Sequence, residues 1–349
     1  MSAKNLQSIF NFTKNYKDPS NKLPLDEKNE NLQVVEKNGM VNISLTVSKE
    51  YLEDYKKLSE LFKENLGKID GILSLNIALT SENRTNTSNT SKLSERKFKV
   101  NAKNIIAIAS GKGGVGKSTF AVNIAVALNQ IGKKVGLLDA DIYGPSIPRM
   151  MGISKKPEAN ENNKLIPLVS FGIKCMSIGF LVGVDTPTIW RGPMVMKALE
   201  QMFNGVEWGD LDYLIIDLPP GTGDAQLTLA QSSKLSGSII VSTPQDIALI
   251  DARKGINMFK KVGVPIIGLI ENMSYFICDN CNEKHFIFST DGAKKESKKF
   301  QIPFLGELPI DKDLRIQSDK GKPCCIDNPK GSIAKTYIEI AKKIDQSKK

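Results

Sequence analysis

Residues 111–119 read GKGGVGKST and constrain this chain more than any other stretch of its sequence. Residues 105–109 before them form an apolar, β-branched run, and residues 120–131 after them carry apolar side chains at helical spacing. Strand, glycine-rich loop and helix in this order are the context that the phosphate-binding signature G-x-x-x-x-G-K-[ST] requires. The glycines let backbone N–H groups point inward around an anion, and the helix adds its positive N-terminal end. The sequence therefore predicts a nucleotide site.

The side chains of this loop have distinct expected roles. Lys117 should reach the β- and γ-phosphates of ATP, and the hydroxyl of Ser118 should hold Mg²⁺. We expect the following loop residues to bind the nucleotide: Gly111, Lys112, Gly113, Gly114, Val115, Gly116, Lys117, Ser118 and Thr119.

Two aspartates follow apolar runs that we interpret as strands. Asp217 ends the run 213–216 and precedes a glycine-rich segment, so we expect it to bind Mg²⁺, by way of water. Asp141 follows the run 135–138 and is expected to position the attacking water and to lie in the outer shell of the metal. Each carboxylate has an alternative role in capping a strand end or forming a turn.

The order of patterns along the chain predicts two domains. Residues 1–30 are polar and rich in Asn and Lys, which indicates a flexible N-terminal arm. Residues 31–79 show a strand–helix–strand pattern, typical of a small α+β domain, and residues 80–100 form a polar linker. Residues 101–349 alternate apolar strands with helices, which predicts a doubly wound, mainly parallel α/β sheet.

Composition limits the partners of this chain. The formal net charge of +10 comes from scattered lysines, whose clusters we interpret as solvated helix faces rather than a nucleic-acid surface. No apolar run is long enough for a membrane span, and the first residues lack the apolar core of a signal peptide. We therefore expect a cytoplasmic protein with no membrane or nucleic-acid partner.

Cys278 and Cys281 form a C-x-x-C pair flanked by polar residues, so their thiols should be accessible. Thiolates suit iron–sulfur clusters or zinc, but one pair supplies only two of the four ligands of a cluster. A twofold dimer would bring a second pair to the same axis. Alternatives are a zinc site that includes His285, a redox pair, or two ordinary thiols, although we expect His285 itself to be a packed or surface residue. The other cysteines are expected in the core: Cys175, Cys324 and Cys325.

The second lysine of the loop, Lys112, gives it a resemblance to the deviant P-loop of the ParA, MinD, nitrogenase-iron-protein and Mrp families. In those families this lysine reaches across a dimer interface to the nucleotide of the partner. Such a cation would stabilise charge on the transferred phosphoryl group, as an arginine finger does. The resemblance implies a homodimer in which Lys112, Lys117 and Asp141 carry out hydrolysis.

Further motifs narrow the resemblance to the Mrp/ApbC family of iron–sulfur cluster carrier ATPases over about residues 100–345. It implies an ATPase that uses ATP and Mg²⁺, assembles a [4Fe–4S] cluster on Cys278 and Cys281, and works with apoproteins and the cluster assembly machinery. It also implies that Asn272 and Pro309 contact adenine. The motifs are GKGGVGKST (111–119), DADIYGPSIP (139–148), WRGPM (190–194), DLPPGTGD (217–224), TPQ (243–245), ENMS (271–274) and CDNC (278–281).

The first domain resembles, more weakly, the small iron–sulfur assembly domain often fused ahead of this ATPase. The family's Cys-containing turn is absent, because residues 46–50 here read TVSKE. A rival interpretation of the whole chain is a MinD- or ParA-like spatial-organisation ATPase with structural zinc or no metal. Such proteins can end in a membrane-anchoring helix, whereas the narrow apolar stripe of residues 332–349 favours packing against the chain's own sheet.

Overall fold

The computed structural model describes residues 2–37, 40–47, 49–66, 69, 72, 74–81, 98–181 and 192–348. The expected linker over 80–100 lies largely outside the described residues, as do Trp190 and Arg191 of the WRGPM motif. The chain divides into two compact units, residues 1–90 and residues 91–349.

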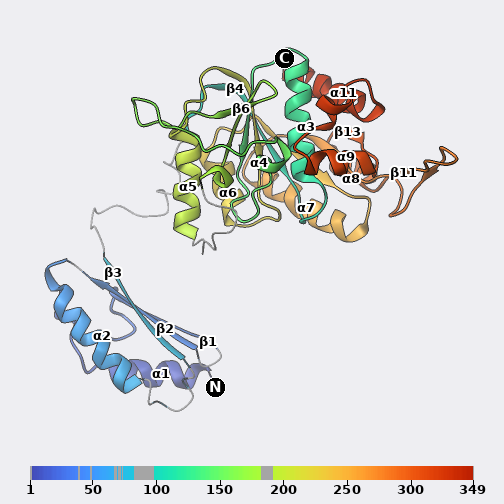
Figure 1. The fold of residues 1–349 in the computed structure, drawn as a ribbon. Helices are drawn as coiled ribbons and strands as arrows, with labels where there is room; N and C mark the ends of the chain where they lie inside the picture. Colours follow the sequence, from blue (N-terminus) through green and yellow to red (C-terminus); the bar gives the residue numbers. More distant parts are fainter. Residues whose placement is uncertain are drawn as a thin grey trace. The chain divides into compact units, whose positions relative to one another are not determined.

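The first unit is a three-stranded sheet with two long helices (Figure 1). The strand order is β1-β2-β3, in which β1 and β2 pair antiparallel while β2 and β3 pair parallel through the helix α2. The strand–helix–strand pattern of the sequence corresponds to β2, α2 and β3, whereas β1 was not expected. The elements are α1 (Ser2–Thr13), β1 (Leu32–Lys37), β2 (Met40–Val47), a 3₁₀ turn (Lys49–Tyr51), α2 (Leu52–Leu66) and β3 (Ser74–Ser81).

The expectation of a flexible arm over residues 1–30 is wrong for the described part of that segment. Ile9 of α1 and Leu25 are fully buried in the core of this unit. The buried carboxylate of Asp18 accepts hydrogen bonds from Tyr55 of α2 and from Asn31, the latter at 2.8 Å. Burial raises the pKa of Asp18, but these hydrogen bonds outweigh it and hold the pKa below its ordinary value. A few buried residues, widely spaced in a polar sequence, thus hold the described part of the segment 1–30 in place through apolar packing and hydrogen bonds.

The second unit contains an eight-stranded sheet of order β13-β10-β9-β4-β8-β5-β7-β6. Its neighbouring described strands pair parallel except β6, which pairs antiparallel with β7. The central strands read as continuous apolar runs because helices cover both faces. The strands are β4 (Ala102–Ala109), β5 (Val135–Asp139), β6 (Leu168–Ser170), β7 (Ile173–Ser177), β8 (Leu211–Asp217), β9 (Gly237–Ser242), β10 (Ile266–Glu271) and β13 (Phe304–Glu307).

The direction of each crossover decides which face a helix covers. The crossover from β4 to β5 runs one way along the sheet and those from β8 to β9 and β9 to β10 run the other, so right-handed connections place their helices on opposite faces. Accordingly α3 packs with α10 and α11, whereas α7 packs with α8 and α5 with α6. The helices are α3 (Lys117–Gln130), α4 (Ile147–Met150), α5 (Gly192–Asn204), α6 (Asp224–Ser232), α7 (Asp246–Lys261), α8 (Gly292–Phe300), α9 (Lys312–Asp319), α10 (Cys324–Asp327) and α11 (Ser332–Gln346).

The C-terminal helix α11 lies along α3 (Figure 1). Its apolar stripe is buried, with Tyr337 stacked at a tilt on Phe120 of α3 and Ile340 beside Gly306 of β13. The predicted packing of the tail against its own domain is therefore confirmed. The three cysteines expected in the core are buried as well: Cys175, Cys324 and Cys325.

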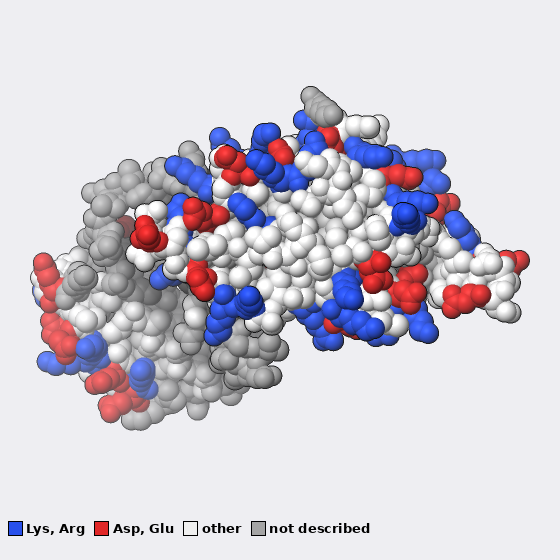
Figure 2. Space-filling view, turned by 45° about the horizontal axis from the view of Figure 1, so that its top comes forward, with Lys and Arg blue, Asp and Glu red and all other residues white. Residues whose placement is uncertain are grey.

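Basic and acidic side chains are interspersed on the face shown in Figure 2 rather than gathered into one basic stripe. The lysines of α8, for example, lie on a helix that also carries the buried Glu296, which pairs with Arg253 of α7. Among the described residues, no helix is both long enough and apolar enough to cross a membrane.

Candidate functional site

The glycine-rich loop lies between β4 and α3, at the carboxyl edge of the sheet where open α/β folds bind ligands. Gly114 and Gly116 adopt positive φ angles of 81° and 84°, which side chains with a Cβ rarely do. Gly116 directly precedes the first residue of α3, Lys117, so the loop delivers its lysine at the helix N-terminus. This is the cradle that the sequence predicts for the phosphates of a nucleotide.

Position 111 has no room for a side chain, because the backbone of α7 lies against it. Substitutions at Gly111 and Gly113 should therefore differ in their effects. A Cβ at Gly111 would lie 2.2 Å from the carbonyl carbon of Asp251, whereas a Cβ at Gly113 would meet only Pro220 Cγ, at 3.9 Å. We expect Gly111→Ala to destabilise the protein by about 1–3 kcal/mol and to weaken ATP binding, because the loop or α7 must move. Thermal unfolding and ATP titration measure both effects. Gly113→Ala is the matched control for stability, and equal thermal unfolding of the two variants would contradict this account.

Lys117 joins the acidic side chains that end two neighbouring strands. Its Nζ lies 2.6 Å from Oδ1 of Asp217, at the end of β8, and 3.8 Å from Oδ2 of Asp141, just after β5. The same Nζ lies 3.2 Å from the Ser118 hydroxyl. The lysine thus lies beside the groups predicted to surround the metal. The structure brings together all four residues that the sequence assigned to phosphate, metal and water.

Asp217 has the features of a metal-binding carboxylate. It is fully buried, and its Oδ2 has no hydrogen-bond partner among the described residues. Burial raises the pKa of Asp217, while Lys117 and Ser118 act in the opposite direction. A buried anionic oxygen without a partner is costly, and a cation with its water shell would satisfy it. The donor set of Asp217 and the Ser118 hydroxyl therefore fits Mg²⁺.

Asp139 is a site residue that sequence reasoning did not single out. Its buried carboxylate accepts hydrogen bonds from the Ser177 hydroxyl at 3.0 Å and from the backbone N–H groups of Asp141 and Ile147, each at 3.2 Å. Burial, together with the charge of Asp217, raises the pKa of Asp139 to about 8. Asp139 thus shapes the turn that carries Asp141. The sequence signal for a role of Asp139 was its position two residues before Asp141. Its partner Ser177 could not be identified, because it lies on β7, a strand that was not predicted.

Asp141 and the segment after Asp217 border an open cavity of about 780 Å³. Asp141 is 14% exposed, and burial raises its pKa while Lys117 lowers it. The segment after β8 is tied to the phosphate loop by the backbone N–H of Gly221, which donates to the Ser110 carbonyl at 2.9 Å. The cavity is lined by Asp141, Tyr143, Gly144, Val195, Met196, Pro219, Pro220, Gly223, Gln226 and Thr228. Space for a ligand or a partner chain thus adjoins the predicted catalytic carboxylate.

Lys112 lies on the exposed part of the loop, in contrast to the buried Lys117. Its carbonyl accepts a hydrogen bond from the Ser110 hydroxyl at 3.0 Å, which holds the backbone, and its side chain is left toward solvent. This placement suits a lysine that acts on the nucleotide of another chain.

Asn272 contacts the phosphate loop itself. Its side-chain amide donates to the carbonyl of Val115 at 2.8 Å, and a Cβ on Gly116 would collide with it. Pro309 lies apart from this contact, in the lining of a second cavity of about 650 Å³ that Cys278 also borders. The adenine contacts expected of Asn272 and Pro309 remain predictions.

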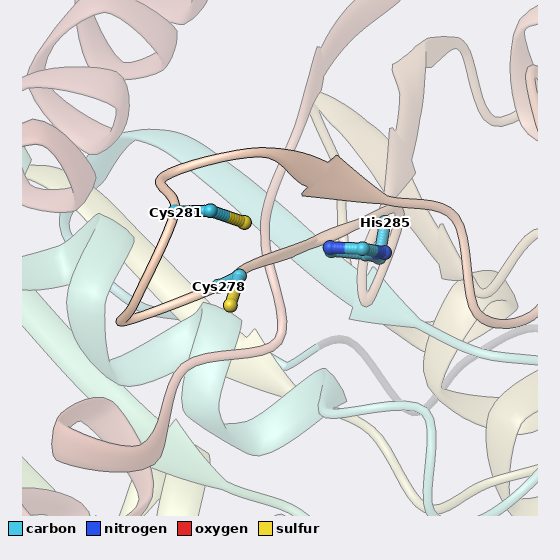
Figure 3. A group of neighbouring side chains, drawn as sticks. All are labelled: Cys278, Cys281 and His285. Carbon is cyan, nitrogen blue, oxygen red and sulfur yellow. The ribbon is translucent and has the colours of Figure 1, made fainter.

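The C-x-x-C pair lies in a small hairpin, β11 (Phe276–Ile277) and β12 (Lys284–His285), that projects from the body of the unit (Figure 1). Cys281 is exposed and Cys278 is half-buried. Backbone N–H groups of Cys281 and Asn280 hold the pKa of Cys278 below its ordinary value. His285 is a surface residue, as expected, but it also lies close to both thiols: the three ligand atoms are within 4.8 Å of one another (Figure 3). The sequence left a zinc site with His285 open as an alternative, although a packed or surface histidine was expected.

The hairpin is connected to the nucleotide loop by a short, hydrogen-bonded path. Asn272 and Cys278 belong to one segment, whose Ser274 N–H donates to the Leu308 carbonyl at 2.9 Å. The Ile310 N–H in turn donates to the Tyr275 carbonyl at 2.7 Å. The segment 272–278 thus joins the contact between Asn272 and Val115 to the hairpin that carries the cysteines.

Comparison with known proteins finds relatives that match about two thirds or more of this chain. An Arabidopsis thaliana protein named "Iron-sulfur protein required for NADH dehydrogenase, mitochondrial" is 55% identical over 243 residues, which cover 69% of this chain and 78% of that protein. The "Iron-sulfur cluster carrier protein" of Aquifex aeolicus is 48% identical over 253 residues, covering 72% and 70% of the two chains.

Solved structures give the same result for the fold. A nucleotide-binding protein from Archaeoglobus fulgidus, described as a complex with ADP and with Co, matches with a TM-score of 0.59 and 39% identity, over 68% of this chain and 93% of that one. The cell division ATPase MinD of Pyrococcus furiosus matches with a TM-score of 0.52 and 22% identity, over 70% and 99%, and supports the fold alone. The family model described as "ParA: NUBPL iron-transfer P-loop NTPase" matches residues 101–345, and the chain belongs to this family of P-loop NTPases.

Proposed function

We propose that this protein is an ATP-hydrolysing carrier of a [4Fe–4S] cluster, which two copies of the chain hold between them and pass to apoproteins. The observation that carries the proposal is the pair of accessible thiols on a projecting hairpin of a P-loop ATPase. Cys278 and Cys281 supply two thiolates, half of the set that a cluster takes. A second copy related by a twofold axis supplies the other half. The exposed hairpin leaves the cluster accessible to an acceptor.

The nucleotide site has a defined task in this proposal. Lys117 leaves Asp217 to bind the phosphates of ATP, which frees the Asp217 carboxylate and the Ser118 hydroxyl for Mg²⁺. Asp217 and Ser118 would hold the metal, which would neutralise charge on the phosphates. Asp141 positions the attacking water, and Lys112 from the partner chain stabilises charge on the phosphoryl group.

The hydrogen bond from Asn272 to Val115 supports a coupling between the two sites. Binding or loss of the γ-phosphate changes the loop, and the segment from Asn272 to Cys278 transmits that change to the cluster-binding hairpin. The cell division and partition functions of MinD-like proteins receive no support from α11, because its apolar stripe is buried against α3 and β13.

Cluster transfer to an acceptor tests the carrier role. The protein is loaded anaerobically with iron and sulfide, desalted, and mixed with an apo-enzyme whose activity requires a [4Fe–4S] cluster, in the presence of an iron chelator. We expect activity to return from the loaded protein and not from equal free iron and sulfide. Equal recovery from both sources, or complete inhibition by the chelator, would contradict a carrier. The same assay with ATP, ADP or no nucleotide shows at which step hydrolysis acts.

A further inference from the structure

The register of the metal-binding hairpin places a histidine beside the cysteines. Phe276 pairs with His285 and Ile277 with Lys284, so the antiparallel strands meet just before Cys278. Residues opposite each other share a face, and faces alternate along a strand. Cys278 therefore returns to the face of His285, at a diagonal position where backbones lie about 7–8 Å apart.

The turn then folds the second thiol over the same face. The Asn282 N–H donates to the Cys278 carbonyl at 2.9 Å, and the Cys278 N–H donates to the Glu283 carbonyl at 3.0 Å. Asn282 adopts a left-handed φ of 58°, which Asn tolerates better than most residues. Figure 3 shows the side chains of Cys278, Cys281 and His285 close together on the hairpin.

The distances fit a single metal ion after a small closure. The two sulfur atoms and the imidazole nitrogen lie within 4.8 Å of one another. In a tetrahedral zinc-like centre, bond lengths of about 2.0–2.3 Å separate neighbouring ligand atoms by roughly 3.5–3.8 Å. Cys281 and His285 are exposed, so rotation of their side chains can supply the remaining movement of about 1 Å without repacking a core.

The donor set selects the class of metal. Two thiolates and one imidazole are ligands for divalent zinc, iron and cobalt, not for magnesium or calcium, which prefer oxygen. Three protein ligands leave a fourth position for water or an incoming ligand, as in open rather than closed zinc sites. His285 is the single histidine of the chain, so no other imidazole of the same chain can take its place.

We propose that Cys278, Cys281 and His285 of one chain form a binding site for a single divalent transition-metal ion, with one open coordination position. This site needs one chain, so it does not rest on the shared [4Fe–4S] cluster of the proposed function. It uses the same two thiols, and the single ion and the bridging cluster therefore exclude each other. His285 is the residue that distinguishes the two states, since the cluster takes its four ligands from the cysteines of two chains.

Cobalt binding to the metal-free, nucleotide-free full chain tests the site. Untagged protein is titrated anaerobically with Co²⁺, and the thiolate-to-cobalt and tetrahedral ligand-field absorptions are followed. We expect one Co²⁺ per chain on a species that sediments as a monomer. His285→Ala should raise the Kd by about 100-fold or more, because even outer-shell changes at metal sites cost 10–100-fold. Glu283→Gln is the matched control on the same hairpin and should bind Co²⁺ as the wild type does.

The single histidine also gives a direct readout of coordination. With ¹⁵N-labelled histidine and Zn²⁺, the imidazole nitrogens of His285 should shift on addition of one equivalent and remain unchanged in Cys278→Ala. Unaltered Co²⁺ affinity in His285→Ala, or the absence of Co²⁺ binding by folded wild-type protein that binds ATP, would overturn the single-ion site.

Cluster reconstitution separates the two proposals. If the cluster forms normally and His285→Ala binds Co²⁺ like the wild type, the carrier role is supported and the single-ion site is not. Tight Co²⁺ binding that depends on His285, in protein that forms no cluster, would support the single-ion site and contradict the carrier role.

Discussion

Replacing Lys112 with alanine is expected to lower the rate of ATP hydrolysis by about 10³-fold or more, while ATP still binds. The phosphates of bound ATP are held by Lys117 and the loop backbone, which this substitution leaves in place. Lys112 is exposed and directed to solvent, so it contributes little to the fold of its own chain. Steady-state phosphate release and equilibrium ATP titration measure the two effects. Lys156→Ala, another exposed lysine of the same unit, is the control and should hydrolyse ATP normally.

Mixed dimers test whether Lys112 acts on the partner's nucleotide. Lys112→Ala protein and Asp141→Asn protein should each be inactive alone, the first for lack of the cation and the second for lack of the carboxylate. In a heterodimer, the site with intact Asp141 receives Lys112 from the other chain. Random mixing makes about half of the dimers heterodimers with one competent site each, so about a quarter of the wild-type rate should return. If mixing restores nothing, Lys112 acts within its own chain or not at all.

Replacing both hairpin cysteines, as Cys278→Ala/Cys281→Ala, is expected to remove the cluster entirely. Reconstituted wild type should hold about four irons per dimer, and the double variant close to none, because each chain loses both of its thiolates and the dimer loses all four. The pair lies on a projecting hairpin outside the buried core, so the variant should fold and bind ATP. Iron and sulfide analysis with visible absorption measures the loss.

The positions between the two cysteines supply the control for this loss. Asp279→Ala/Asn280→Ala changes two exposed residues of the same turn and keeps both thiols. We expect it to retain its iron. Iron that persists in the cysteine variant, or that vanishes equally from the control, would show that the hairpin thiols are not the ligands.

The sequence predicts best the features that depend on neighbouring residues. The phosphate loop, Asp217 and the C-x-x-C pair follow short local patterns, and the structure places them as those patterns predict. The apolar runs 105–109, 135–138 and 213–216 correspond to β4, β5 and β8, because strands buried on both faces are almost continuously apolar.

The remaining features depend on contacts between distant residues. The segment before β1 reads as polar, yet Asp18, Asn31 and Tyr55 form a buried network that orders it. Asp139 acquires its role from Ser177 on β7, across a pairing that no local pattern indicates. His285 was only an alternative zinc ligand in the sequence, because its place beside the thiols depends on the register of the β11–β12 hairpin.

Sedimentation of the reconstituted protein tests most directly the claim that one cluster is shared by two chains. Absorption of the cluster and of the protein are recorded in the same anaerobic run, and the iron content of each species is measured. The account predicts that the cluster absorption travels only with the dimer, with about four irons per two chains. Cluster absorption on the monomer, or four irons on each chain, would contradict it.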